Sequence, residues 1–219
     1  MIILDFDGTL ADSAPWFAGE LNAVARRFGF REVDSVGMGR MRRMDTAAIL
    51  RFLRVPAWKL PFIARHMRQR VAEDAAAIPL FPGTLALLER LAEQAPLAVA
   101  SSNSEANIRR ILGPGAARIG RYACGASLFG KARKFRRLIH AAGVEPGSVL
   151  CIGDELRDIE AARAVGARCV AVAWGYADRA VLVGGRPDLV ADEMEALPAA
   201  LHRMGWPGTP PASPGGYLP

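Results

Sequence analysis

The chain has 219 residues, of which 51% are hydrophobic, and this length suits one large domain or a core domain with a small insert. No apolar stretch reaches the roughly 18 residues of a membrane span, and Asp5 interrupts the first apolar run, so we expect neither a membrane helix nor a signal peptide but a cytoplasmic protein. The net charge of +6 is compatible with nucleic acid and equally with a small phosphorylated substrate.

The first predicted element is a short buried strand over residues 2–4, which are apolar and β-branched or aliphatic. Asp5 and Asp7 follow it directly. Because side chains alternate between the two faces of a strand, both carboxyl groups are expected on one side of its carboxyl end, where open α/β sheets bind ligands. Two carboxylates held close together need a cation, or one of them must carry a proton.

Residues 14–79 are predicted to be entirely helical, with helices near residues 14–28, 45–53 and 59–76 separated by prolines. A helical segment of this length between two strands predicts an inserted cap domain rather than a long connection. The segment is strongly basic from residue 40 to residue 70. Arg42 and Arg43 are expected either to lie in solvent or to bind a second anionic group of a substrate.

The chain then alternates helices with strands as far as residue 173. Strands are predicted over residues 97–100, 119–124, 149–152 and 168–173, and helices over residues 85–94, 105–112, 131–142 and up to about 165. This alternation predicts a Rossmann-like, mostly parallel α/β sheet with right-handed crossovers. The predicted domains are therefore a core of residues 1–13 and 80–205, the helical cap of residues 14–79, and a Pro- and Gly-rich disordered tail of residues 206–219.

Polar residues follow the second predicted strand. Ser101 comes first, with Ser102 and Asn103 behind it. Ser104 is better placed than Ser101 to cap the next helix, which leaves Ser101 free to bind a ligand. Ser102 takes that place if the strand ends one residue later.

Two further polar positions lie beyond. Lys131 begins a basic helix, with Lys134 as the alternative one turn along it. Asp154 follows the strand over residues 149–152, and Asp158 lies one helical turn later. Lysine and carboxylates at neighbouring strand ends suit a phosphoryl group with a hard cation.

Residues 5–13, with the sequence DFDGTLADS, resemble the first motif of the haloacid dehalogenase (HAD) superfamily in its phosphatase form. Ser101, Lys131 and Asp154 with Asp158 match the order and spacing of the other three motifs. The resemblance spans roughly residues 1–175, and the cap matches only as a helical insertion of the right size and place. It most resembles the phosphoglycolate phosphatase-like group, acting on a small phosphorylated metabolite.

The resemblance implies a role for each motif residue. Asp5 would be the nucleophile that forms an aspartyl-phosphate, and Asp7 the general acid and base. Mg²⁺ would be bound by Asp5, the backbone carbonyl of Asp7, and Asp154. Ser101 and Lys131 would bind the phosphate.

The remaining candidates support these residues. Thr9 and Asp158 are expected behind the metal, where Asp158 would hold metal-bound water or orient Lys131. The candidates for substrate contact are Gly8, Ser102, Asn103, Arg42 and Arg43.

Three other functions remain open. A β-phosphoglucomutase-like phosphotransferase shares all four motifs. A phosphonoacetaldehyde hydrolase-like enzyme would use Lys59 of the cap, but that family, like the dehalogenases, replaces the second Asp, which is present here as Asp7. A non-catalytic nucleic-acid-binding protein has only the positive charge in its favour, because interleaved aromatic residues are missing. The sequence leaves the substrate and the choice of monomer or homodimer open.

Overall fold

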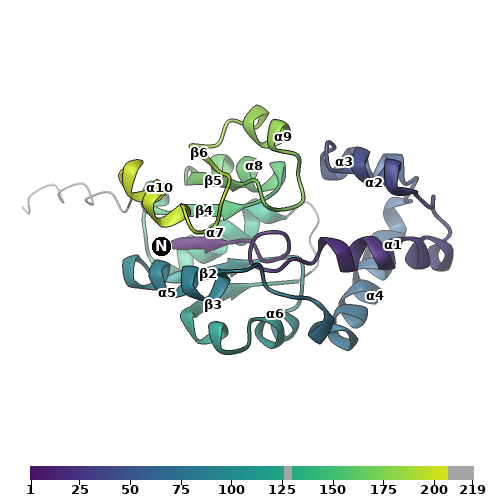
Figure 1. Cartoon of the computed structure of the whole chain (residues 1–219), viewed down its shortest axis with the longest axis horizontal. Coiled ribbons are helices and arrows are strands. Elements are labelled where there is room, and N and C mark those ends of the chain that lie inside the picture. Colours follow the sequence, from purple (N-terminus) through teal and green to yellow (C-terminus); the bar gives the residue numbers. More distant parts are fainter. Residues whose placement is uncertain (126–129, 207–219) are drawn as a thin grey trace, which may run out of the picture.

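The computed structural model describes residues 1–125 and 130–206. Six parallel strands form one sheet in the order β3-β2-β1-β4-β5-β6 (Figure 1). The strands are β1 (Ile2–Leu4), β2 (Leu97–Ala100), β3 (Ile119–Ala123), β4 (Leu150–Gly153), β5 (Arg168–Val172) and β6 (Leu189–Ala191). The predicted α/β fold with a parallel sheet is confirmed, and the four strands predicted after residue 80 are found to within a residue at each end.

Helices cover both faces of this sheet, because successive strand residues point to opposite sides. Ile2 and Leu4 of β1 pack on one side, against α5 (Thr84–Gln94), α6 (Glu105–Leu112) and α10 (Leu197–Arg203). Ile3 packs on the other side, against α7 (Lys131–Ala142), α8 (Leu156–Val165) and α9 (Arg179–Gly184). The core is thus a three-layer sandwich, in which strands buried on both faces read as continuous apolar runs.

The segment of residues 14–79, called the cap segment here, lies beyond the carboxyl ends of the strands (Figure 1). Its helices are α1 (Ala14–Phe28), α2 (Ser35–Met41), α3 (Thr46–Phe52) and α4 (Leu60–Glu73). Short 3₁₀ turns complete the chain: η1 (Ala57–Lys59), η2 (Ala75–Ala77), η3 (Gly113–Arg118) and η4 (Pro146–Ser148).

The two connections to the cap segment run side by side. Asp12 N–H donates to the Pro79 carbonyl at 2.9 Å, and Phe81 N–H donates to the Leu10 carbonyl at 3.0 Å. Ala11 forms an antiparallel bridge with Leu80 between them. The chain therefore enters and leaves the cap segment through one short paired junction at the edge of the site.

Four elements were absent from the sequence-based expectation: α2, α9, β6 and α10. Trp206, the first residue of the predicted tail, is buried at 5% exposure in the core beside α10. The rest of that predicted tail, residues 207–219, lies outside the described residues. None of the helices in residues 1–125 and 130–206 combines the length and apolar character needed to cross a bilayer.

Candidate active site

Three neighbouring strands end at the same level and bring the predicted site residues together. Leu4 of β1 is in register with Val99 of β2 on one side and with Ile152 of β4 on the other. Asp5 follows β1, the polar residues that begin with Ser101 follow β2, and Asp154 follows β4. All of them therefore lie at the carboxyl edge of the sheet. After β1 the chain adds β2 and β3 on one side of it, and then returns to add β4 on the other side. The topological switch point, where open α/β sheets bind ligands, therefore lies between β1 and β4 at this edge.

A buried acidic cluster lies at this edge. Asp5, Asp154 and Asp158 each offer a carboxylate oxygen, and the three oxygens lie within 4.8 Å of one another. Their exposed fractions are 3%, 0% and 1%. The Asp7 carboxyl is outside this group; the sequence-based role of Asp7 toward a metal used its backbone carbonyl.

Asp154 is fixed from both sides. Thr9 Oγ1 donates to Asp154 Oδ1 at 2.9 Å, and Tyr176 N–H donates to Oδ2 at 2.8 Å. A Cβ atom on Gly8 or on Gly175 would overlap the Asp154 side chain, so glycine is required at both positions. These contacts hold one carboxylate rigidly within a narrow cradle.

This cluster fits a hard divalent cation. Burial, and after it the charges of Glu155 and Asp5, raise the pKa of Asp154 well above its ordinary value. Three buried carboxylates repel one another, and a cation among them removes that repulsion. The donors are all oxygens, which are the ligands that Mg²⁺ prefers. Asp5 and Asp154 would hold the ion in this cluster.

Lys131 supplies the positive charge within the site. Its ammonium group forms ion pairs with the carboxylates of Asp5 and Asp158. Burial alone would lower the pKa of Lys131, but Asp158 and Asp5 together raise it above its ordinary value. Asp158 is held in turn by the Glu155 N–H, which donates to Oδ2 at 3.0 Å. This ion pair is compatible with the expected role of Asp158 in orienting Lys131, which stays a prediction.

Lys134, the sequence-based alternative to Lys131, contacts backbone carbonyls instead of the acidic cluster. Its Nζ donates to the backbone carbonyls of Ser101 and Gly125 at 2.5 and 2.7 Å. These two hydrogen bonds connect α7 with the loop after β2 and with the residues after β3. Lys134 forms no ion pair with the acidic cluster, whose ion pairs are made by Lys131. The geometry therefore favours Lys131 as the charged group next to Asp5.

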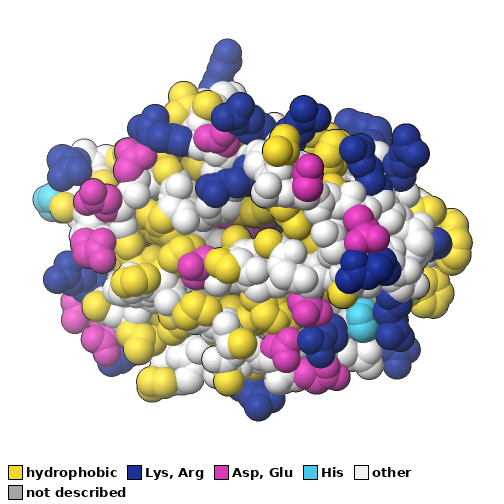
Figure 2. All heavy atoms as spheres, turned by 45° about the vertical axis from the view of Figure 1, so that its right-hand side comes forward, with side chains coloured by type: hydrophobic (Ala, Val, Ile, Leu, Met, Phe, Trp, Pro, Cys, Tyr) yellow, Lys and Arg dark blue, Asp and Glu magenta, His cyan; other side chains and the backbone are white. Residues whose placement is uncertain are grey.

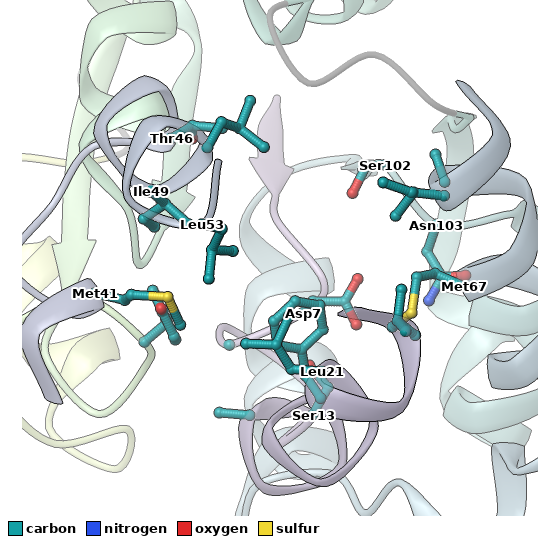
Figure 3. A pocket seen from close by; sticks show the side chains of 18 of the residues that line it. Asp7, Ser13, Leu21, Met41, Thr46, Ile49, Leu53, Met67, Ser102 and Asn103 are labelled. Atoms are coloured by element: carbon teal, nitrogen blue, oxygen red, sulfur yellow. The ribbon is translucent and has the colours of Figure 1, made fainter. Parts of the chain in front are cut away.

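Asp7 points into a cavity beside the acidic cluster (Figure 3). Ser101 Oγ lies 3.4 Å from Asp7 Oδ2 and donates to it, while Asn103 N–H donates to the same hydroxyl at 3.0 Å. Removal from water, and next the charge of Asp5, raises the pKa of Asp7 to about 6. A carboxyl group with this pKa can both give and accept a proton near neutral pH.

Ser104 caps α6 as expected, since its Oγ accepts from Asn107 N–H at 3.2 Å.

The cavity has a volume of about 320 Å³ and extends from Asp7 into the cap segment. Gly8, Ser102 and Asn103 line it, and their contact with a substrate stays a prediction. Arg42 and Arg43 are not among its lining residues.

The two arginines bind the loop after β5 instead. Arg42 Nη2 donates to the Gly175 carbonyl at 3.3 Å, and Arg43 Nε pairs with Asp178 at 2.7 Å. Both contacts link the end of α2 to the core. A direct contact of these arginines with substrate stays a prediction without support from this arrangement.

Two other arginines, which were not among the residues predicted for the site, line the cavity. Arg157 lies between Asp154 and Asp158 and pairs with Glu155 at 2.5 Å. Arg68 lies on α4, and its Nη1 is buried without a hydrogen-bond partner among the described residues. The sequence could have indicated Arg68 as a cavity residue, because helical spacing places it on the same face of α4 as four apolar residues. These also line the cavity: Ile63, Ala64, Met67 and Val71.

Comparisons with known proteins agree with this geometry. Residues 2–172 match the family model described as haloacid dehalogenase-like hydrolase. A phosphoglycolate phosphatase from Synechococcus elongatus is 34% identical over 206 residues, which are 93% of this chain and 97% of that protein. A phosphoglycolate phosphatase from Agrobacterium fabrum is 30% identical over 217 residues, covering 92% of this chain and 91% of that protein.

A solved structure shares the fold as well. It is a haloacid dehalogenase-like family protein from Streptococcus pneumoniae, with a TM-score of 0.76 and 20% identity. The match covers 91% of this chain and 97% of the other.

Proposed function

The chain belongs to the haloacid dehalogenase-like hydrolase family, and from this premise we propose that it is a Mg²⁺-dependent phosphomonoester hydrolase of the phosphoglycolate phosphatase type. The observation that carries the proposal is the convergence of Asp5, Lys131 and Asp154 within one buried cluster, with Asp7 and Ser101 beside it. A phosphoryl group needs this combination of a nucleophile, positive charge and a proton donor.

In the proposed reaction, an Asp5 carboxylate oxygen attacks phosphorus and the bond from phosphorus to the ester oxygen breaks. The protonated Asp7 carboxyl gives its proton to the departing alkoxide. Ser101 and Lys131 hold the phosphoryl oxygens, and Asp158 keeps Lys131 in place. When bound, magnesium would neutralise the negative charge shared by Asp5 and the phosphate.

The second half regenerates the enzyme. Water attacks phosphorus of the aspartyl-phosphate, and the Asp7 carboxylate takes its proton. The bond from phosphorus to the Asp5 oxygen then breaks, and inorganic phosphate leaves. The pKa of about 6 for Asp7 supports both of its roles, because neither protonation state is strongly disfavoured near neutral pH.

We further propose that residues 14–79 act as a cap domain over the core of residues 1–13 and 80–205. The paired connections at Asp12 and Phe81 support this division, since a short junction can serve as a hinge. The exchange of substrate and product would then accompany movement of the cap.

The experiment measures phosphate release from phosphoglycolate and p-nitrophenyl phosphate, with Mg²⁺ and with EDTA. Asp5→Asn is expected to lower kcat by about 10³-fold or more, because it removes the nucleophile. Asp192→Asn, at an exposed pair with Arg179, is the matched control and should retain activity. Hydrolysis that persists in EDTA or in Asp5→Asn would refute the proposal.

A further inference from the structure

The cavity next to Asp7 is apolar over most of its wall. Met41, Ile49, Leu53 and Met67 surround the space into which Asp7 points, and Leu21 of α1 closes it below (Figure 3). These side chains come from all four helices of the cap segment. The cap therefore presents a hydrophobic chamber to the catalytic carboxyl group.

Leu21, Met41 and Leu53 of the cap segment pack with Val33 in a small buried cluster, and the same three side chains line the chamber. None of the residues of α3 is buried, and Val71 is the one buried residue of α4. Ile49 of α3 and Met67 of α4 stay half-buried because they face the cavity. Apolar surface left uncovered at this site favours an apolar occupant, because filling it removes that surface from water.

Polar lining residues gather where the cavity meets the sheet. Asp7, Ser102 and Asn103 come from the loops after β1 and β2, and Arg157 from the start of α8. Arg68 joins them from α4, since its carbonyl accepts from Asn107 at 3.0 Å beside Asn103. The cavity thus has a polar end at the reacting atoms and an apolar end in the cap.

A glycolate leaving group would reach only the polar end of the cavity, where Arg68 and Arg157 lie. A charged group that extended further, into the apolar end, would lose its hydration without a counter-charge. At about 320 Å³ the cavity also falls within the range of pockets that enclose drug-sized ligands. A two-carbon acid would leave much of the chamber wall uncovered.

We propose that the preferred substrate is a phosphomonoester of a bulky apolar alcohol, aliphatic or aromatic, whose hydrocarbon part fills the chamber of the cap segment. The phosphate lies at Asp5 and Lys131, and the ester oxygen lies near Asp7. This substrate class rests on the proposed phosphatase function and departs from the substrate named for the curated relatives.

The test compares kcat/KM for methyl, ethyl, propyl and butyl phosphate with that for phosphoglycolate. These alkanols differ little in acidity, so changes along the series report on binding of the hydrocarbon part. We expect kcat/KM to rise about fourfold for each added methylene group. A flat series, or phosphoglycolate as the best substrate, would overturn the assignment.

A pair of variants locates the effect. Ile49→Trp adds bulk to the cavity wall, and it should lower the butyl-to-methyl ratio of kcat/KM about tenfold or more. Val36→Trp adds the same side chain to α2 at a site that is 61% exposed and outside the lining, so the ratio should stay unchanged. Equal ratios in the two variants would contradict the placement of the hydrocarbon part.

Binding of phosphonates separates this inference from the proposed reaction. Calorimetry with Mg²⁺ measures the Kd of methylphosphonate and of butylphosphonate, neither of which is hydrolysed. Tighter binding of butylphosphonate, by about tenfold or more, is expected even if every ester resists hydrolysis, and in that case only the phosphatase proposal fails. Hydrolysis of esters together with equal Kd values would leave the phosphatase and refute the apolar substrate.

Discussion

At the scale of single residues, charge balance around Lys131 organises the site. One ammonium group serves two carboxylates, Asp5 and Asp158, and Asp154 adds a third negative charge nearby. The cluster therefore keeps an excess of negative charge, which a divalent cation can offset. Burying an ionised group without a partner of opposite charge is costly, so the loss of Lys131 or of one carboxylate should destabilise the other charged groups of the cluster.

Replacing Lys131 tests this balance. In EDTA, Lys131→Ala should lower the free energy of unfolding by about 3–5 kcal/mol, because it leaves two buried carboxylates without their partner. Mg²⁺ should restore more stability to the variant than to the unchanged protein. Denaturant unfolding with and without Mg²⁺ measures both effects.

Arg133→Ala is the control for this change, since Arg133 is exposed on the same helix and should alter stability by less than about 0.5 kcal/mol. If Lys131→Ala were as stable as this control in EDTA, the charge balance described above would be wrong.

Sequence patterns predicted the identity of the charged residues better than their contacts. Asp5 and Asp154 were selected because they follow strands and Asp158 because it lies one helical turn after Asp154, and the structure brings the three together. The choice of Lys131 over Lys134 stayed open, because residues three apart share a helix face and only the loop after β2 distinguishes them. Arg42 was expected either in solvent or at a second anionic group of the substrate, because local charge alone does not show the direction in which a side chain points.

At the scale of elements, the four that were missed are all short, but shortness alone does not explain the failure, because the three-residue strand β1 was predicted. β6 has three residues at the sheet edge and lacks the polar motif that follows β1 and marks its end. α2 contains Gly37 and Gly39, which lower helix propensity, yet Asp34 Oδ1 accepts from Gly37 N–H at 2.7 Å and caps its start. Tertiary packing and a cap outweigh propensity in such an element.

The loop after β5 provides an element-level prediction. Gly175→Ala should weaken Mg²⁺ affinity by about 10- to 100-fold, because its Cβ would displace Asp154 and the Gly8 carbonyl. Titration of activity with Mg²⁺ measures the change. Gly39→Ala is the matched control: it lies in open space on α2 and should raise stability by about 0.5–1 kcal/mol without changing Mg²⁺ affinity. Unchanged affinity in Gly175→Ala would show that the close packing around Asp154 is dispensable.

At the scale of the whole molecule, two kinds of surface meet at the site. Figure 2 shows Lys and Arg side chains mainly along the upper and right edges of the face that includes the cap segment, Asp and Glu among them at the left and lower edges, and apolar side chains toward the middle. The chain as a whole carries a net charge of +6, whereas the floor of the site is acidic. A net positive charge raises the local concentration of a phosphorylated ligand, and in the substrate class proposed above the apolar chamber selects among such ligands.

Metal binding should stabilise the whole fold, because the cluster joins the residues that follow β1 and β4 to a residue of α8. Mg²⁺ at about 100 times its Kd is expected to raise the free energy of unfolding by about 2.7 kcal/mol. Asp154→Asn should abolish this gain, whereas Asp192→Asn should retain it, since Asp192 is 57% exposed and pairs with Arg179 away from the cluster. Thermal unfolding with and without Mg²⁺ measures the gain. An equal gain in both variants would place the metal elsewhere.

The most direct test of the account is to trap the phosphorylated enzyme. Asp7→Asn cannot supply the base for hydrolysis, but p-nitrophenolate leaves without a proton, so the first half of the reaction can proceed. Mixing this variant with p-nitrophenyl phosphate and Mg²⁺ should give a burst of p-nitrophenolate and a chain heavier by one phosphoryl group, located on Asp5 by peptide mass spectrometry. A burst without covalent phosphate, or phosphate on another residue, would contradict the assignment of Asp5 as the nucleophile.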